Sequence, residues 1–196
     1  AHRDDIAAIM RDLVAECVMT MIKACDLPVT VKTRIGLDNT EEYSFLRHFV
    51  ETVAACGCET FIIHARKAWL NGLSPKENRE VPPLRYEVVY RLKQDFPSLR
   101  IVINGGIHTL DECREHLRHV DGVMLGREAY DNPWMLSEVD AGLFGAPAAT
   151  FTRAELLRRY LPYIERELSN GTPLAHITRH ILGLFKGEHD GRAFRR

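Results

Sequence analysis

The sequence predicts an α/β fold in which short parallel strands alternate with helices. Four apolar runs rich in β-branched residues are separated by segments with a helical spacing of apolar residues, and they cover 28–33, 60–64, 100–104 and 121–125. The third and fourth runs stop abruptly at glycine, in Asn104-Gly105-Gly106 and Leu125-Gly126-Arg127. Strands and helices that alternate in this order form parallel βα units with right-handed crossovers. Four such units make half of a (β/α)8 barrel.

A helix and a strand open the chain. Apolar residues repeat at helical spacing over 6–26, which predicts an amphipathic helix that ends before a proline. The β-branched run that follows, 28–33, predicts a strand with Lys32 near its carboxyl end. A second apolar face at helical spacing predicts a helix over 41–56.

The second strand, 60–64, ends at His64 and leads into a long loop over 67–84. Loops of more than about 12 to 15 residues in a compact domain are usually functional. A helix over 86–96 then leads to the third strand, and Thr109 is a typical N-cap for the helix before the fourth.

After the fourth strand the pattern changes. The stretch 142–151, with its glycine, alanine and proline, is typical of a linker. The capping box Thr152-Arg153-Ala154-Glu155 opens an amphipathic helix, and a second helix is predicted over 173–185. We therefore expect a half-barrel over 1–141, a linker over 142–151 and a small helical domain over 152–196.

The composition excludes several classes of protein. The chain has 196 residues, of which 45% are hydrophobic, and this fits one domain with an appendage. Its five cysteines are an odd number, so we expect reduced thiols in the cytoplasm. Cys56-Gly57-Cys58 lacks the spacing of a zinc site, and no apolar run approaches the roughly 20 residues that cross a bilayer. We expect neither a metal site nor a membrane segment.

The formal net charge of −1 conceals a basic end, because three arginines lie within 192–196. Such an end can bind a polyanion locally. A solvated and frayed tail has the same composition, so charge alone leaves both interpretations open.

Polar residues and glycines gather where the predicted strands end. In a parallel sheet these ends share one edge, which brings together Lys32, His64, Asn104 and the Gly126-Arg127 pair. Glycine loops let backbone N–H groups approach a phosphate, and Lys32 and His64 can neutralise charge on a reduced ring. Flavin mononucleotide, FMN, is a ligand of this kind. Taken singly, each residue also has an interpretation without a ligand. Lys32 fits a solvated lysine, His64 a core or rim histidine, and the glycines ordinary strand-to-helix turns.

Four motifs carry a resemblance to a known family. They are Val29-Thr30-Val31-Lys32-Thr33-Arg34-Ile35-Gly36, the stretch 63–79 that reads Ile-His-Ala-Arg-Lys-Ala-Trp-Leu-Asn-Gly-Leu-Ser-Pro-Lys-Glu-Asn-Arg, Ile103-Asn104-Gly105-Gly106-Ile107, and Leu125-Gly126-Arg127-Glu128-Ala129-Tyr130. Together they resemble the tRNA-dihydrouridine synthases, and the long loop resembles the synthase A subfamily. The resemblance implies the second half of the barrel followed by part of a helical tRNA-binding domain.

The resemblance also implies a reaction. Enzymes of this family use NADPH to reduce FMN, and the flavin then reduces uridine to 5,6-dihydrouridine in the tRNA D-loop, at about position 20. By similarity the FMN-binding residues are Lys32, His64, Asn104, Gly105, Gly106, Gly126 and Arg127. The tRNA-binding residues implied in the same way are Lys76, Arg79, Arg192 and Arg195.

One expected part is missing from the sequence. The family's catalytic cysteine donates a proton from an Asn-x-Gly-Cys-Pro motif, which does not occur in these residues. We therefore assign no catalytic residue here, expect the proton-donor cysteine upstream of Ala1, and expect the isolated chain to be inactive. Two alternatives stay open: a non-catalytic tRNA-binding remnant, and another FMN- or phosphate-binding barrel oxidoreductase that acts on a small metabolite.

Overall fold

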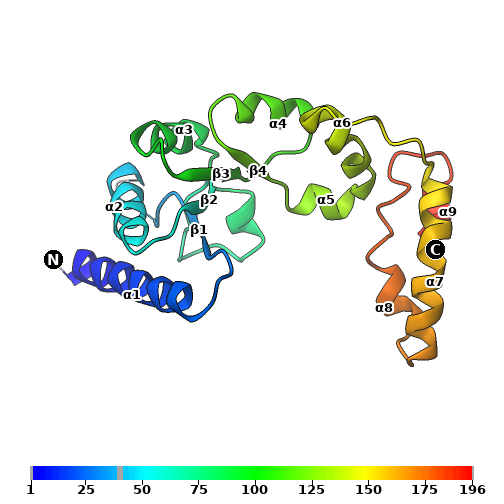
Figure 1. The fold of residues 1–196 in the computed structure, drawn as a ribbon, viewed down its shortest axis with the longest axis horizontal. Helices are drawn as coiled ribbons and strands as arrows, with labels where there is room; N and C mark the ends of the chain where they lie inside the picture. Colours follow the sequence, from blue (N-terminus) through cyan, green and yellow to red (C-terminus); the bar gives the residue numbers. More distant parts are fainter. Residues whose placement is uncertain (1, 39–41, 196) are drawn as a thin grey trace. The chain divides into compact units, whose positions relative to one another are not determined.

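The computed structural model describes residues 2–38 and 42–195, and the side chains of 11–38 and 43–195. The helices and strands follow in the order α1 (His2–Ala24), β1 (Thr30–Arg34), α2 (Glu42–Ala55), β2 (Thr60–His64), α3 (Tyr86–Asp95), β3 (Arg100–Asn104), α4 (Leu110–Leu117), β4 (Gly122–Met124), α5 (Arg127–Asp131), α6 (Val139–Phe144), α7 (Arg153–Ser169), α8 (Leu174–Thr178) and α9 (Gly191–Phe194) (Figure 1). Two short 3-10 helices, η1 (Glu77–Arg79) and η2 (Pro133–Glu138), lie between them.

The chain forms two compact units. The first comprises residues 1–106 and 115–124, and the second comprises 107–114 and 125–196. The whole sheet belongs to the first unit, whereas residues 125–141, which we had grouped with the half-barrel, cluster with the C-terminal helices.

The sheet has four parallel strands in the order β1-β2-β3-β4. Each strand pairs with the next strand along the chain, which is the arrangement that consecutive βα units produce. The predicted α/β fold is confirmed at this level. The predicted bounds of the second and third strands, 60–64 and 100–104, match the structure at both ends.

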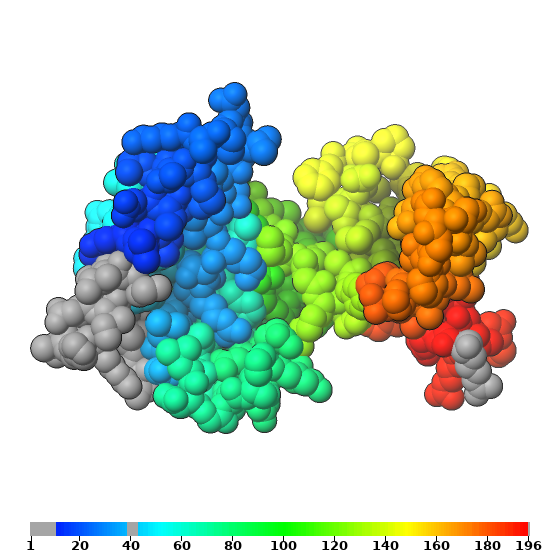
Figure 2. Space-filling view, turned by 90° about the horizontal axis from the view of Figure 1, so that it is seen from below, coloured from blue at the N-terminus to red at the C-terminus, as the bar shows by residue number. Residues whose placement is uncertain are grey.

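One face of the sheet holds the core of the first unit. Phe61 and Ile63 on β2, and Ile101 and Ile103 on β3, are fully buried. Helix α3 packs on β3 and against α2, and both helices contribute buried aliphatic side chains. Helix α1 packs against α2, and its described residues, drawn in blue, lie on the surface of this unit in Figure 2. Positions 6, 9 and 10 of the predicted apolar stripe lie outside the described side chains.

The other face of the sheet is more open. Side chains alternate between the two faces of a strand, so Lys32, Ile62 and Val102, which pair across the sheet, share this second face. Lys32 is exposed, and Ile62 and Val102 are only half-buried. The second face therefore presents both apolar and charged groups.

The second unit is helical. The predicted capping box opens α7, because Thr152 Oγ1 accepts from Glu155 N at 3.2 Å and the Glu155 carboxylate accepts from Thr152 N at 2.6 Å. Helix α7 packs against α8, with Ile164 and Ile177 buried.

The helix predicted over 173–185 is wrong in its length, because α8 ends at Thr178. Beyond it the backbone bonds join residues three apart, such as Leu184 N to Ile181 O at 2.9 Å. Gly183 lies so close to another segment that a Cβ there would be 2.5 Å from Asp131 O. The low helix propensity of glycine also disfavours a helix that continues through Gly183.

The segment after Asn132 is also more regular than we predicted. We expected a linker from residue 142, but η2 and α6 carry helical structure to Phe144. Gly145 ends α6 with a φ of 68° in the left-handed region. Glycine adopts this conformation without a steric cost, and it is the common end of a helix.

Candidate functional site

The sheet register aligns the predicted polar residues at the carboxyl ends of the strands. Arg34, His64 and Asn104 pair with one another across β1, β2 and β3. Lys32 lies two residues before the end of β1, so it shares their face of the sheet. The structure thus brings Lys32, His64 and Asn104 together, as the sequence predicted.

Asn104 is buried and anchors the end of its strand. Its side-chain amide Nδ2 donates to Met124 O at 2.8 Å, and its backbone oxygen accepts from Ala65 N at 2.9 Å. These bonds join β3 to both neighbouring strands immediately before the glycine pair. Asn104 therefore fixes the point at which the Gly105-Gly106 loop leaves the sheet.

The Gly105-Gly106 loop requires glycine at both positions. Their φ angles are 116° and 68°, which other residues rarely adopt. A Cβ on Gly105 would be 3.1 Å from His64 Cε1, and a Cβ on Gly106 would be 2.5 Å from Leu84 Cδ1. The imidazole of His64 therefore packs directly against the loop backbone, so both belong to one site.

Lys32 carries a perturbed charge at this edge. Although the residue is exposed, partial desolvation and then the charge of Arg34 lower the pKa of the Lys32 amine. A bound anion would offset both effects, because it would favour the protonated amine. This environment is suited to an anionic ligand.

Arg34 is a residue of the site that lies one position beyond the strand predicted over 28–33. It is the last residue of β1, and its Nη1 donates to Lys67 O at 2.6 Å and to Asn78 O at 2.9 Å. Burial, followed by the charges of Arg66 and Arg79, lowers the pKa of its guanidinium. The signal in the sequence is an arginine at a strand end that precedes a long loop.

The long loop is held in a defined shape. The Asn78 side chain accepts from Trp69 N at 2.8 Å and donates to Trp69 O at 2.6 Å. Lys76 is the N-cap of η1 and Arg79 is its last residue, and both are exposed. The loop therefore presents these two cations to solvent on one short helix that Arg34 and Asn78 anchor.

Gly126 and Arg127 follow β4 in the sequence but belong to the second unit. Gly126 is the N-cap of α5, and no atom lies within 4 Å of the place that its Cβ would occupy. The fold therefore does not need glycine there for space. Its bare backbone instead leaves the start of α5 open to a ligand.

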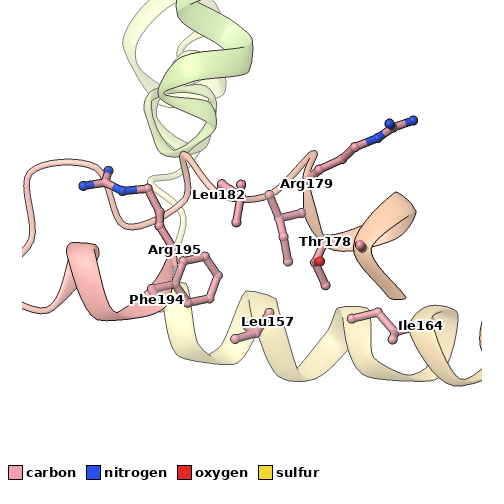
Figure 3. Close-up of a pocket in the computed structure, with 9 residues that line it drawn as sticks. Leu157, Ile164, Thr178, Arg179, Leu182, Phe194 and Arg195 are labelled. Atoms are coloured by element: carbon pink, nitrogen blue, oxygen red, sulfur yellow. The ribbon is translucent and has the colours of Figure 1, made fainter. Parts of the chain in front are cut away.

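The basic end of the chain forms part of the helical unit. Arg192 lies within α9, and Arg195 is the C-cap of that helix. Arg195 also lines a cavity of about 420 Å³ together with Phe194, Leu157 and Ile164 (Figure 3). The guanidinium group of Arg195 points away from this cavity, so the charge faces outward and the lining is largely apolar.

The cysteines lie on helices, in loops or directly before a strand. All five are free, with Cys17 and Cys25 on or directly after α1 and Cys113 on α4. Cys58 is buried just before β2, at the amino end of the strand, and burial raises the pKa of its thiol. Across the described ranges, no three His, Cys, Asp or Glu side chains are grouped so that they could hold a metal ion. Within the same ranges, no helix has the length and apolar character to span a bilayer.

Comparison with known proteins gives consistent matches. A family model described as Dihydrouridine synthase (Dus) matches residues 7–196. A tRNA-dihydrouridine(20/20a) synthase of Shewanella oneidensis is 58% identical over 185 residues, covering 94% of this chain and 55% of the relative. The Yersinia pestis protein of the same name is 60% identical over 186 residues, covering 94% of this chain and 54% of the relative.

The chain spans about half the length of the curated relatives that it matches. Among solved structures, a nitroalkane oxidase from Streptomyces ansochromogenes matches 87% of this chain and 56% of its own, at 17% identity and a TM-score of 0.31. That similarity is too low to support an argument.

Proposed function

Because this chain belongs to the dihydrouridine synthase family, whose members are flavin-dependent oxidoreductases, we propose that it carries part of the flavin site and of the tRNA-binding surface of a tRNA-dihydrouridine synthase. The proposed reaction is the NADPH-driven reduction of uridine to 5,6-dihydrouridine in the D-loop of a cytoplasmic tRNA. The name of the relatives, tRNA-dihydrouridine(20/20a) synthase, suggests that the reduced uridine is at position 20 or 20a. The observation that carries the proposal is the alignment of Lys32 and His64 beside the Gly105-Gly106 loop.

The residues at the strand ends fit FMN. When bound, FMN supplies a ring that takes up hydride from NADPH and transfers it to uracil. Lys32 can hold a proton against negative charge on that ring, and His64 can donate a hydrogen bond beside it. Asn104 sets the direction of the glycine loop, and the backbone of Gly105 and Gly106 can approach a phosphate closely.

Gly126 and Arg127 complete the proposed FMN-binding set as phosphate-binding residues of the second unit. The open backbone at Gly126 supports this assignment, because a phosphate needs close access to N–H groups. Arg127 adds a planar guanidinium that can hold phosphate oxygens in pairs.

Lys76, Arg79, Arg192 and Arg195 are proposed to bind tRNA. Cations that grip phosphates act regardless of base sequence, whereas the shape of the protein decides which nucleotide is presented. The rigid anchoring of η1 supports this role for Lys76 and Arg79, because a fixed loop presents its charges in one arrangement.

We propose that none of the cysteines of this chain protonates uracil. Cys58 precedes β2, at the opposite end of the strand from His64, and Cys113 lies on α4. We therefore expect that this chain, by itself, binds its ligands but does not convert uridine.

We also propose that its four strands are the second half of a barrel, with a helical domain after it.

Salt-dependent tRNA binding tests the proposal. A labelled unmodified tRNA is titrated with the chain at several salt concentrations, for wild type, Lys76→Glu/Arg79→Glu and Arg192→Glu/Arg195→Glu. Each double variant should weaken tRNA binding by about tenfold or more. The slope of log K against log salt concentration should become shallower by the amount expected for about one to two lost phosphate contacts. Lys23→Glu, an exposed charge reversal in the last turn of α1, is the control and should have little effect.

Two outcomes would contradict the proposal. Losses of affinity in the control and the double variants that are equal for each reversed charge would mean that net charge alone governs binding. Unchanged binding in both double variants would favour a barrel oxidoreductase that acts on a small metabolite.

A further inference from the structure

Tyr86 contacts the Gly105-Gly106 loop from helix α3, which contributes no residue to the proposed site. It is the first residue of α3, and its hydroxyl donates to Gly105 O at 2.8 Å. Its ring packs edge-on against the ring of His116, with the centroids 4.4 Å apart and the planes at 65°. His116 is only 5% exposed, and its Nδ1 lies 2.7 Å from the Tyr90 hydroxyl. The Tyr86 ring therefore packs in a partly buried aromatic cluster, which restricts where its hydroxyl can lie.

This bond sets the direction of one peptide group. The Gly105-Gly106 peptide is trans, so the carbonyl of Gly105 and the N–H of Gly106 point in opposite directions. Because Tyr86 binds the carbonyl, the N–H of Gly106 must point away from Tyr86. A peptide between two glycines meets little steric resistance to rotation, since neither flanking residue has a Cβ. A single hydrogen bond can therefore decide which way the peptide faces.

We infer that Tyr86 is a positioning residue that fixes the Gly106 N–H toward a bound phosphate. The inference rests on the proposed function, because it assumes that the loop receives the phosphate of FMN. The Tyr86 hydroxyl bonds the peptide at its carbonyl oxygen. It would act by keeping the donor pre-oriented, so that binding does not first have to turn the peptide.

Tyr86 should affect binding of the phosphate of FMN and not of its flavin ring. Loss of the hydroxyl should weaken the grip on the phosphate and leave contacts with the flavin ring unchanged. FMN and riboflavin share the ring, and only FMN carries the phosphate. The ratio of their dissociation constants therefore reports on the loop alone.

The test compares Tyr86→Phe with wild type by quenching of flavin fluorescence on titration with the chain. Phenylalanine keeps the ring that packs on His116, and a melting curve verifies that the variant is folded. The variant should bind FMN about fivefold more weakly, the effect of one hydrogen bond, with riboflavin affinity unchanged. Tyr43→Phe is the matched control, because its hydroxyl bonds to Asp95 and touches neither the loop nor His116, and it should leave both affinities unchanged.

Two results would overturn the inference while the proposed function stands. They are an unchanged ratio of FMN to riboflavin affinity in Tyr86→Phe, and an equal loss of FMN affinity in Tyr43→Phe. A wild-type chain that binds FMN no better than riboflavin would overturn both the inference and the phosphate site on which it rests.

Discussion

Replacing Gly106 with alanine should destabilise the first unit by about 2 kcal/mol. An L-residue in the left-handed region costs about 1 kcal/mol, and Gly106 has a φ of 68°. The new Cβ would also lie 2.5 Å from Leu84 Cδ1, so the Leu84 side chain must move. Leaving a favoured rotamer costs about 1 kcal/mol more.

Gly72 provides a matched control for the strain of the backbone. Its φ is 83°, it belongs to the same unit, and no atom lies within 4 Å of the place of its Cβ. Gly72→Ala should therefore cost only the backbone part, about 1 kcal/mol. The difference between the two variants isolates the contact between the loop and Leu84.

Urea denaturation followed by circular dichroism measures both free energies of unfolding. The slope with denaturant should stay the same in both variants, because neither changes the surface that unfolding exposes. If Gly106→Ala costs no more than Gly72→Ala, the glycine loop does not pack on Leu84 as described. The close backbone approach on which the phosphate site depends would then be refuted.

Three further predictions concern charges and hydroxyls around this unit. Partial desolvation and the charge of Arg34 lower the pKa of Lys32, and the negative charge of bound FMN should raise that pKa again. The affinity of the chain for FMN should then fall as pH rises from that lowered pKa through the usual 10.5. Calorimetric titration should show no such fall in Lys32→Gln. Arg34→Gln removes two bonds to the long loop and should cost about 2 kcal/mol, with faster amide exchange over 67–79 as the measurement. The pKa of Tyr43 is raised to about 12, by burial first and then by its bond to Asp95. A raised pKa contributes stability that is complete below the ordinary value of 10.0 and is lost as pH rises through about 12. Tyr43→Phe should lose about 1 kcal/mol at pH 8 and show a shallower alkaline decline in denaturation series.

Local patterns carried most of the prediction of the sheet. Strands β2 and β3 are buried runs with clear polar or glycine ends, so the sequence alone placed their bounds. Because parallel pairing aligns strand ends, it also predicted that Lys32, His64 and Asn104 meet at one edge. These features depend on neighbours in the sequence and on general topology.

Contacts between distant segments could not be predicted in this way. Gly183 lies close to the backbone of Asp131, and the sequence near Gly183 does not record that neighbour. Arg34 binds the long loop 33 and 44 residues further along the chain, and Tyr86 binds Gly105 across 19 residues. Each role follows from a three-dimensional partner that composition and periodicity do not identify.

A titration of the isotope-labelled chain with FMN, followed by the amide signals in NMR spectra, tests the central claim most directly. The account predicts that the largest shifts fall on Gly105 and Gly106, with further shifts at Lys32 and His64. Riboflavin should leave the two glycine signals nearly unchanged, because it lacks the phosphate. Shifts confined to the helices α7 and α9, or equal glycine shifts with both flavins, would contradict a phosphate site at the carboxyl ends of the strands.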